Sequence, residues 1–378
     1  MDVARARADM PACQERIYLD HAGVAPLSGP AAEVVAAAAA DMARNGWLNR
    51  KRWGRLVDRG RVLFARMIGA APGDIAYVKN TSQGLLLAAN SLPLGEGDNV
   101  VVFHGEFPAN VYPWLALARR GVETRLVRPE PDRRIPPGLV ASVMDSRTRA
   151  VALSAVQFGS GFRADLGAIG DLCRARGAYF VVDMIQCVGA VPMDVSETPF
   201  DVGAADGHKW LLGPEGIGYL YCRPEILDQL APTYMGWNSV RDAYDFEHYD
   251  ATPRPDARRF EEGSLNVLGA CGLAASVELL ASWGRDWVYA RVLELTHHVA
   301  EQVRRRGFEL LSPMERLEER SGIVIFRVPG HDSGALVESL VSGGVLCAAR
   351  GGGIRFSPHA YNTEDEIDEA FRRLDGQV

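Results

Sequence analysis

The sequence predicts an α/β protein with a large domain, in which helices cover a mostly parallel sheet, and a small α+β domain after it. Three observations lead to this prediction. The 378 residues suffice for two domains of ordinary size. Between about residues 70 and 225, short apolar runs alternate with amphipathic helical segments, a pattern typical of a parallel sheet covered on both faces. From residue 263 onward, a long helical region precedes an isolated strand and helix.

Composition narrows the classes of protein and of partner. With 47% hydrophobic and 24% charged residues, the chain has the make-up of a folded globular protein. A net charge of −7 predicts that it binds neither nucleic acid nor an anionic membrane. The N-terminal MDVARARADM lacks the apolar region of a signal peptide, and the six cysteines show no metal-ligand spacing. We therefore expect a cytoplasmic protein with reduced thiols and no metal.

The large domain is expected to contain several buried strands. Apolar runs of suitable length occur at Val100–Phe103, Ala150–Phe158, Tyr179–Val182 and Ile217–Cys222. Between the second and third runs, Asp165–Gly177 has the apolar periodicity of a helix, with Gly177 as its stop. Because ligands of such sheets bind beyond the carboxyl ends of the strands, residues that follow the strands are candidates for a site.

The smaller domain is expected to follow a long helical region. Gly263–Gly307 has helical periodicity, Ile323–Val328 is apolar like a strand, and Ser333–Ser342 again predicts a helix. We divide the chain into residues 1–25, which pack with the small domain, a large domain over 26–284 and a small domain over 285–378.

Lysine is scarce in this chain. Only Lys51, Lys79 and Lys209 stand among 41 basic residues. Lysine, unlike arginine, can lose its proton and form a covalent bond to an aldehyde, so a retained lysine is a candidate for chemistry.

Four short motifs fall near the expected strand ends. They are Asn80-Thr81-Ser82-Gln83-Gly84, Val181-Val182-Asp183, Asp206-Gly207-His208-Lys209-Trp210 and Gly353-Ile354-Arg355-Phe356. Each alone could be a helix cap or a salt-bridge partner. Together they supply an amine for an aldehyde, a carboxylate for a pyridine nitrogen, hydroxyls at a helix start for a phosphate, and an arginine for a carboxylate. This combination predicts a pyridoxal 5′-phosphate site.

The segments VDMIQCVGAVPMDV, DGHKWLLGPEGIGYLY, RRFEEGSLN and IRFSPHAYNTEDEID resemble the class V aminotransferase family of fold-type I pyridoxal-phosphate enzymes. That family includes cysteine desulfurases, kynureninases and isopenicillin-N epimerases. The resemblance covers essentially the whole chain. It implies the fold-type I architecture, pyridoxal phosphate as cofactor and a homodimer with shared active sites.

The resemblance also implies roles for individual residues. For the cofactor, Lys209 would hold the aldehyde, Asp183 the pyridine nitrogen and Gln186 the phenolic oxygen. Other residues implied to contact the cofactor are Thr81 and Ser82 at the phosphate, His208 at the phosphate or the imine, Phe107 stacked on the ring, and Ser264, which would reach the phosphate of the neighbouring subunit. Arg355 would bind the substrate carboxylate, with Arg350 a weaker candidate and Trp237 a residue that shapes the pocket.

Three departures from the family pattern bear on the reaction. Phe107 stands where desulfurases carry a stacking histidine, and a phenyl ring cannot transfer a proton. The loop that carries the desulfurase cysteine shrinks to three glycines, and we interpret Cys347 as a buried apolar residue. Asp206 stands where relatives place a phosphate-binding hydroxyl, so a carboxylate there must turn away or cap the following turn.

These observations predict an enzyme that acts at Cα or Cβ of a small amino acid, with His208 and Asp183 assisting Lys209. Aminotransferase-type chemistry is the first prediction. The alternatives are a carbon–sulfur lyase similar to cysteine desulfurases, an amino-acid epimerase, and a catalytically inactive binding protein that retains the fold.

Overall fold

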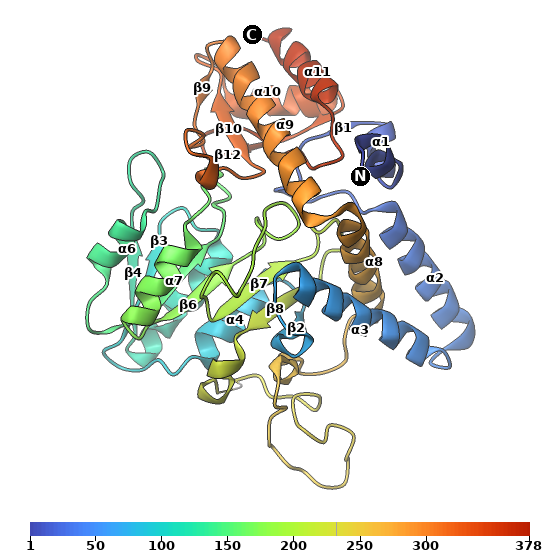
Figure 1. Ribbon diagram of the computed structural model, residues 1–378, viewed down its shortest axis with the longest axis vertical. Coiled ribbons are helices and arrows are strands. Elements are labelled where there is room, and N and C mark those ends of the chain that lie inside the picture. Colours follow the sequence, from blue (N-terminus) through green and yellow to red (C-terminus); the bar gives the residue numbers. More distant parts are fainter. Residues whose placement is uncertain (232) are drawn as a thin grey trace.

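A computed structural model describes residues 1–231 and 233–378, and within them a seven-stranded sheet forms the centre of the molecule (Figure 1). In spatial order its strands are β2 (Ile75–Val78), β8 (Gly218–Cys222), β7 (Val202–Asp206), β6 (Tyr179–Asp183), β5 (Thr148–Ser154), β3 (Asn99–Phe103) and β4 (Glu123–Val127). In this described sheet, β8 runs antiparallel to the six other strands. The predicted mostly parallel sheet is confirmed.

Helices bury the two faces of this sheet in separate apolar clusters. On one face, Tyr77, Val182 and Tyr219 pack with α3 (Arg50–Met67), α7 (Leu166–Ala175) and α8 (Val267–Trp283). On the other face, the residues that alternate with these along the strands pack against α4 (Thr81–Ser91). This arrangement follows from the period of two along a strand, which sends successive side chains to opposite faces. α2 (Gly29–Asn45) packs on α8 outside this layer.

One predicted strand is wrong at its end. β5 stops at Ser154, whereas the apolar run continues to Phe158. The backbone turns back after Gln157, whose N–H donates to Phe162 O at 2.9 Å, and Gly161 there has φ +74°. Phe158 therefore lies in a loop beyond the carboxyl end of β5.

The predicted helical region Gly263–Gly307 is two helices. α8 ends at Trp283, and α9 (Arg285–Arg305) leaves at an angle of 82°. Gly284 between them has φ +87°, a backbone conformation that suits glycine and interrupts the helix. In the described residues no single helix is long and apolar enough to cross a membrane; only this bent pair, taken together, reaches that length.

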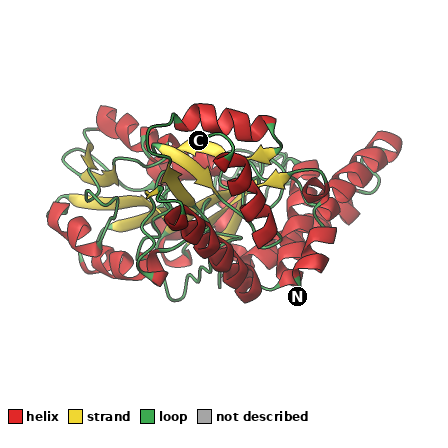
Figure 2. Cartoon of the chain, turned by 90° about the horizontal axis from the view of Figure 1, so that it is seen from above, coloured by secondary structure: helices red, strands yellow, loops and turns green. Residues whose placement is uncertain are grey.

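The C-terminal part contains an antiparallel sheet beside helices α9, α10 (Ser333–Ser342) and α11 (Glu364–Asp375), shown at the top of Figure 1 and from above in Figure 2. In spatial order its strands are β12 (Ala348–Arg350), β13 (Gly353–Phe356), β10 (Val324–Arg327) and β9 (Glu309–Leu310). The N-terminal β1 (Ile17–Tyr18), which follows α1 (Val3–Ala8), pairs with β11 (Val345–Leu346) in parallel. The division of the chain at residues 25 and 284 stays a prediction.

Candidate active site

Lys209 lies in a tight turn that follows β7. Asp206, the last residue of β7, accepts a hydrogen bond from Gly207 N–H at 2.7 Å through its own Oδ1. The Asp206 carboxylate therefore caps the turn, one of the two arrangements that the sequence allowed for it. Two residues further on, His208 O accepts from Ala25 N–H at 2.8 Å, which ties the N-terminal segment to the lysine turn.

The pKa of the Lys209 amine lies close to neutral pH. Its pKa is lowered to about 8: burial has the largest effect and the neighbouring Arg355 guanidinium adds to it, against the opposing effects of Asp183, Asp20 and Asp206. An amine with this pKa is partly neutral near pH 7, which is the form that attacks an aldehyde or accepts a proton.

Asp183 ends β6 and is 2% exposed. Its Oδ1 accepts from Ile185 N–H at 3.0 Å. Burial raises the pKa of Asp183 to about 7, with a further rise from Glu106 and a lowering effect of Lys209. Such a carboxylate is stabilised as an anion by a cationic N–H group placed against it.

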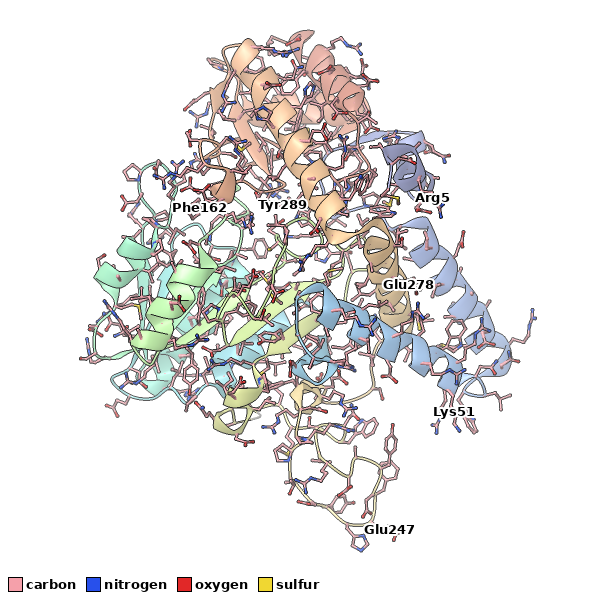
Figure 3. All side chains as sticks on the ribbon, in the orientation of Figure 1. Arg5, Lys51, Phe162, Glu247, Glu278 and Tyr289 are labelled. Carbon is pink, nitrogen blue, oxygen red and sulfur yellow. The ribbon has the colours of Figure 1, made fainter. Side chains whose placement is uncertain are left out.

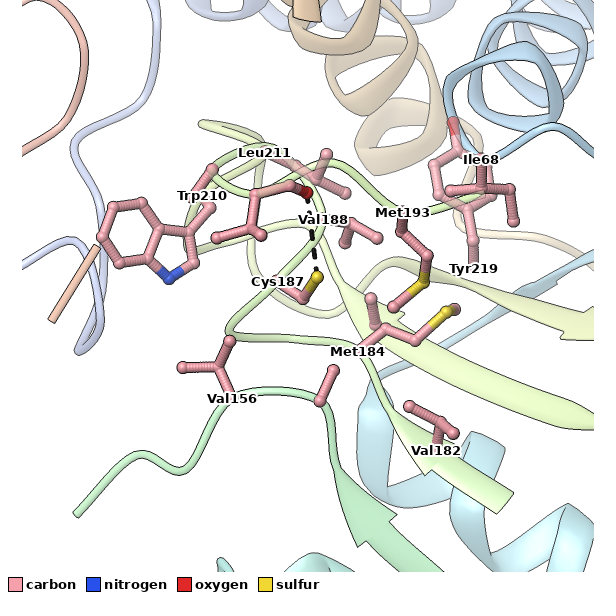
Figure 4. Packing of buried hydrophobic residues seen from close by; sticks show 14 of the residues in the cluster. Ile68, Val156, Val182, Met184, Cys187, Val188, Met193, Trp210, Leu211 and Tyr219 are labelled. Carbon is pink, nitrogen blue, oxygen red and sulfur yellow. Dashed lines mark hydrogen bonds between the residues drawn. The ribbon is translucent and has the colours of Figure 1, made fainter. Parts of the chain in front are cut away.

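Gln186 follows in the loop after β6 and is held between two segments. Its Nε2 donates to Ala22 O at 2.9 Å, and its Oε1 accepts from Trp210 Nε1 at 2.8 Å. One amide hydrogen of Gln186 remains for a ligand. Close by, Trp210 and Cys187 lie in the apolar cluster that anchors this loop (Figure 4).

The start of α4 lies against the end of β7. Thr81 Oγ1 accepts from Asp206 N–H at 2.9 Å, whereas Ser82 is exposed. A Cβ at Gly84 would collide with Ala204 of β7, so this glycine permits the close approach. His208 Nδ1 lies 3.1 Å from Asp206 Oδ1 without the alignment of a hydrogen bond, and it is buried without a partner among the described residues.

Arg355 reaches the same region from β13. Its Nη2 lies 2.8 Å from Asp20 Oδ1, and its Nη1 donates to Phe158 O at 3.5 Å. Burial lowers the pKa of Arg355, and Asp20 opposes this effect. The Nε of Arg355 is buried and lacks a hydrogen-bond partner within the described residues. Arg350, by contrast, is exposed and donates to the adjacent Ala349 O.

Phe107 forms an aromatic wall beside the lysine. The Lys209 Nζ lies 5.6 Å from the centroid of the Phe107 ring, which is 45% exposed. Phe158 meets that ring edge to face, at 5.4 Å between centroids. The side chain that precedes Phe107 is a buried carboxylate, Glu106.

Ser264 and Trp237 stand apart from this group. Ser264 is exposed, two residues after Glu262, which forms an ion pair with Lys79 at 2.9 Å. Trp237 is 46% exposed and packs against Tyr244 at 5.8 Å. Among the described residues, neither forms a hydrogen bond or a ring contact with Lys209, Asp183 or Arg355.

Sequence reasoning missed Asp20 and Glu106 as parts of the site. Asp20 follows the buried Leu19, and Glu106 comes three residues after β3. In both cases an acid lies within three residues of the end of an apolar strand. This signal could have drawn attention to them.

Comparisons with known proteins relate the whole chain to one family. Residues 17–370 match the family model described as aminotransferase class-V. A probable cysteine desulfurase from Methanothermobacter thermautotrophicus is 29% identical, over 96% of this chain and 94% of its own. Isopenicillin N epimerase from Streptomyces clavuligerus is 31% identical, over 85% and 84%. The apo structure of cysteine desulfurase from Thermococcus onnurineus NA1 has a TM-score of 0.89 at 24% identity, over 100% and 98%.

Proposed function

Because this chain belongs to the class V aminotransferase family, we propose that it is an enzyme that moves a proton at Cα of a small α-amino acid, in aminotransferase-type chemistry. Its cofactor is pyridoxal phosphate. When bound, this cofactor supplies an aldehyde that condenses with amines and a protonated pyridine ring that withdraws electrons from the bonds at Cα. One observation carries the proposal: Lys209 is partly buried, and its amine is within the electrostatic reach of both Asp183 and Arg355.

The residues present fit this cofactor. The buried Asp183 would hold the protonated pyridine nitrogen. This cationic partner would stabilise the buried carboxylate as an anion. Gln186 would donate its remaining amide hydrogen to the phenolic oxygen, and Phe107 would stack on the ring. The Nδ1 of His208, which makes no aligned hydrogen bond to the nearby Asp206 carboxylate, would donate to the phosphate, beside Thr81 and Ser82 at the start of α4.

Lys209 would act as both cofactor anchor and proton carrier. With a substrate bound at the cofactor, the Lys209 amine would accept the Cα proton. Its pKa of about 8 makes it a base near neutral pH that can also return the proton at a second position. Asp183 assists by keeping its charge beside the ring nitrogen throughout.

Arg355 would bind the substrate carboxylate and so orient the Cα–H bond. Its buried Nε has no partner within the described residues, and its Nη2 is shared with Asp20. A planar guanidinium holds a carboxylate by two hydrogen bonds, which fixes direction as well as affinity. Arg350 stays a weaker candidate because it points to its own strand.

Aminotransferase-type chemistry is favoured because one base suffices for it. Epimerisation removes a proton from one face of Cα and adds one to the opposite face, and so favours a base on each side. Lys209 is the one lysine that the described residues bring to this site. Carbon–sulfur lyase chemistry is the second candidate, supported by the desulfurase relatives. Transfer of sulfur to a cysteine is disfavoured: Cys347 is buried, and burial raises the pKa of its thiol to about 12.

The assembly belongs to the same proposal: the enzyme works in the cytoplasm as a homodimer. Its residues 233–256 form a loop that projects from the large sheet, with Glu247 near its tip (Figure 3). Six large apolar residues are exposed along it: Tyr234, Met235, Trp237, Tyr244, Phe246 and Tyr249. So large an apolar surface favours burial against a second copy, where Ser264 would approach the partner's phosphate site.

An amino-acid panel tests the reaction. Holoenzyme is incubated with each amino acid, with and without a keto-acid acceptor, and keto acid, ammonia, sulfide and the opposite enantiomer are quantified. Acceptor-dependent keto-acid formation is the expected result. Sulfide release from cysteine or cystine without an acceptor would instead establish the lyase, and racemisation alone the epimerase.

A further inference from the structure

Glu106 is a buried side chain that the proposed chemistry leaves unused. It is 5% exposed, and both carboxylate oxygens accept two hydrogen bonds each. Oε1 accepts from Ser154 N–H at 2.8 Å and from Gln157 Nε2. Oε2 accepts from Asn110 Nδ2 at 3.0 Å and from Ser154 Oγ.

These partners indicate the charge of Glu106. Three of the four are N–H groups, which donate and cannot accept, so a protonated carboxyl group would turn its hydrogen toward a donor or the Ser154 hydroxyl. Burial raises the pKa of Glu106, while the four hydrogen bonds stabilise the ionised form. The fully satisfied state of this group is the anion.

The sheet places this anion next to Asp183. Ser154, which holds Glu106 through both its N–H and its hydroxyl, is the register partner of Asp183 in the parallel pair β5–β6. One residue further, Ala155 N–H donates to Asp183 O at 2.9 Å. Glu106 is therefore fastened to the strand position directly beside Asp183.

We infer that Glu106 is a positioning residue that acts through Asp183, as a second buried anion that keeps the cofactor's ring nitrogen protonated. The inference rests on the proposed role of Asp183. Two neighbouring anions bind a proton between Asp183 and the ring nitrogen more tightly than one does. The other charged groups facing this pair are Lys209 and, around it, Arg355, Asp20 and Asp206. Those four stay unchanged when Glu106 is substituted.

The test measures the protonation of the ring nitrogen directly. Holoenzyme is reconstituted with cofactor labelled with ¹⁵N in the ring, and the ¹⁵N chemical shift is followed from pH 6 to 10 for the wild type, Glu106→Gln and Asn110→Ala. Glu106→Gln removes the charge and keeps the shape, whereas Asn110→Ala removes one hydrogen bond and keeps the charge. Glu106→Asp, with the charge restored, is the rescue variant.

We expect the ring nitrogen of Glu106→Gln to lose its proton at a pH about one unit lower than in the wild type, a shift typical of nearby buried charges. Asn110→Ala and Glu106→Asp should titrate close to the wild type. Equal titration of Glu106→Gln and the wild type overturns the inference and leaves the role of Asp183 standing. A wild-type ring nitrogen that is neutral at pH 7 overturns both.

A second measurement examines the protonation state of glutamic acid in the wild-type protein. In wild-type holoenzyme labelled with ¹³C-glutamate, infrared difference spectra show whether any glutamic acid is protonated at pH 7. The inference expects no such band from Glu106. A band of a protonated glutamic acid at pH 7 that Glu106→Gln lacks overturns it, since the buried Glu319 could contribute a band of its own.

Discussion

Arg355 and Asp20 form an ion pair, with Nη2 and Oδ1 2.8 Å apart, between residues separated by 335 positions in the chain. Gly23 makes room for it, because a Cβ at that position would overlap the Asp20 carboxylate. If a substrate carboxylate binds Arg355, as we propose, it would meet an arginine already paired with an acid. It would have to bind on the remaining edge of the guanidinium or displace Asp20.

Arg355→Lys keeps the charge and loses the planar fork. For α-amino acids we expect a loss in kcat/KM worth roughly 2–4 kcal/mol, the scale of one charge-assisted contact. Amines without a carboxylate should lose far less. Arg174→Lys serves as the control, because that side chain is exposed on α7 and has no place in the proposed site. Equal losses for both kinds of substrate would make Arg355 structural.

Lys209→Ala should abolish covalent attachment of the cofactor and turnover, since no other amine takes its place beside Asp183. The measurements are the visible absorbance of the purified protein and borohydride reduction followed by peptide mapping. Lys79→Ala is the matched control, because Lys79 is exposed and pairs with Glu262. Labelling of Lys79 in the wild type would contradict the assignment.

Asp183→Asn should retain bound cofactor and slow proton removal from Cα by several orders of magnitude, because a neutral pyridine withdraws electrons poorly. Single-turnover kinetics with a Cα-deuterated substrate isolate that step. Asp201→Asn controls for the loss of a buried carboxylate, since Asp201 accepts from Phe180 N–H before β7 begins, away from the carboxyl ends of the strands. Near-normal rates in Asp183→Asn would assign the role to another group.

Cys347→Ala should keep most of the activity. The thiol is buried among apolar residues of the small sheet and lies on no loop that could carry it to a substrate. Assays with the best substrate of the panel check this expectation. A persulfide trapped on Cys347 during cysteine turnover would restore the desulfurase reaction.

The buried His359 predicts a loss of stability in acid. Burial lowers its pKa to about 4, from roughly 6.5 in an unfolded chain. Its neutral ring accepts from Ala360 N–H at 2.8 Å and donates to Trp210 O, and protonation destroys the first bond. Its contribution is fully present above pH 6.5 and declines as pH falls toward 4. Tm measured from pH 7.5 to 4.5 should fall more steeply in the wild type than in His359→Asn.

Sequence reasoning succeeded where a local pattern determines the structure. The apolar runs before Asp183 and at 217–222 predicted strands to within one residue, and the motifs of Lys209 and Arg355 do meet beyond the ends of strands. The roles of these residues at the cofactor stay predictions. We inferred these roles from the chemistry of the side chains and from the family resemblance, and the positions of the residues in the structure are compatible with them.

Other features depend on contacts that no local pattern reveals. β4 reads Glu-Thr-Arg-Leu-Val, a mixed run whose place at the sheet edge decides its structure. Asp20 pairs with Arg355 through β1, a strand of two residues too short for any periodicity. The buried state of Glu106 depends on Ser154 and Gln157, some 50 residues away.

The parallel pair of β1 with β11 has a consequence for biosynthesis. The seven-stranded sheet is built from residues 75–222, so the half of the site that contains Lys209 and Asp183 can assemble while the ribosome is still translating. The N-terminal segment, with Asp20, must wait for β11 and Arg355. At roughly 5–20 residues per second, that delay lasts many seconds. The residues proposed to hold the cofactor are thus synthesised well before the arginine proposed to bind the substrate.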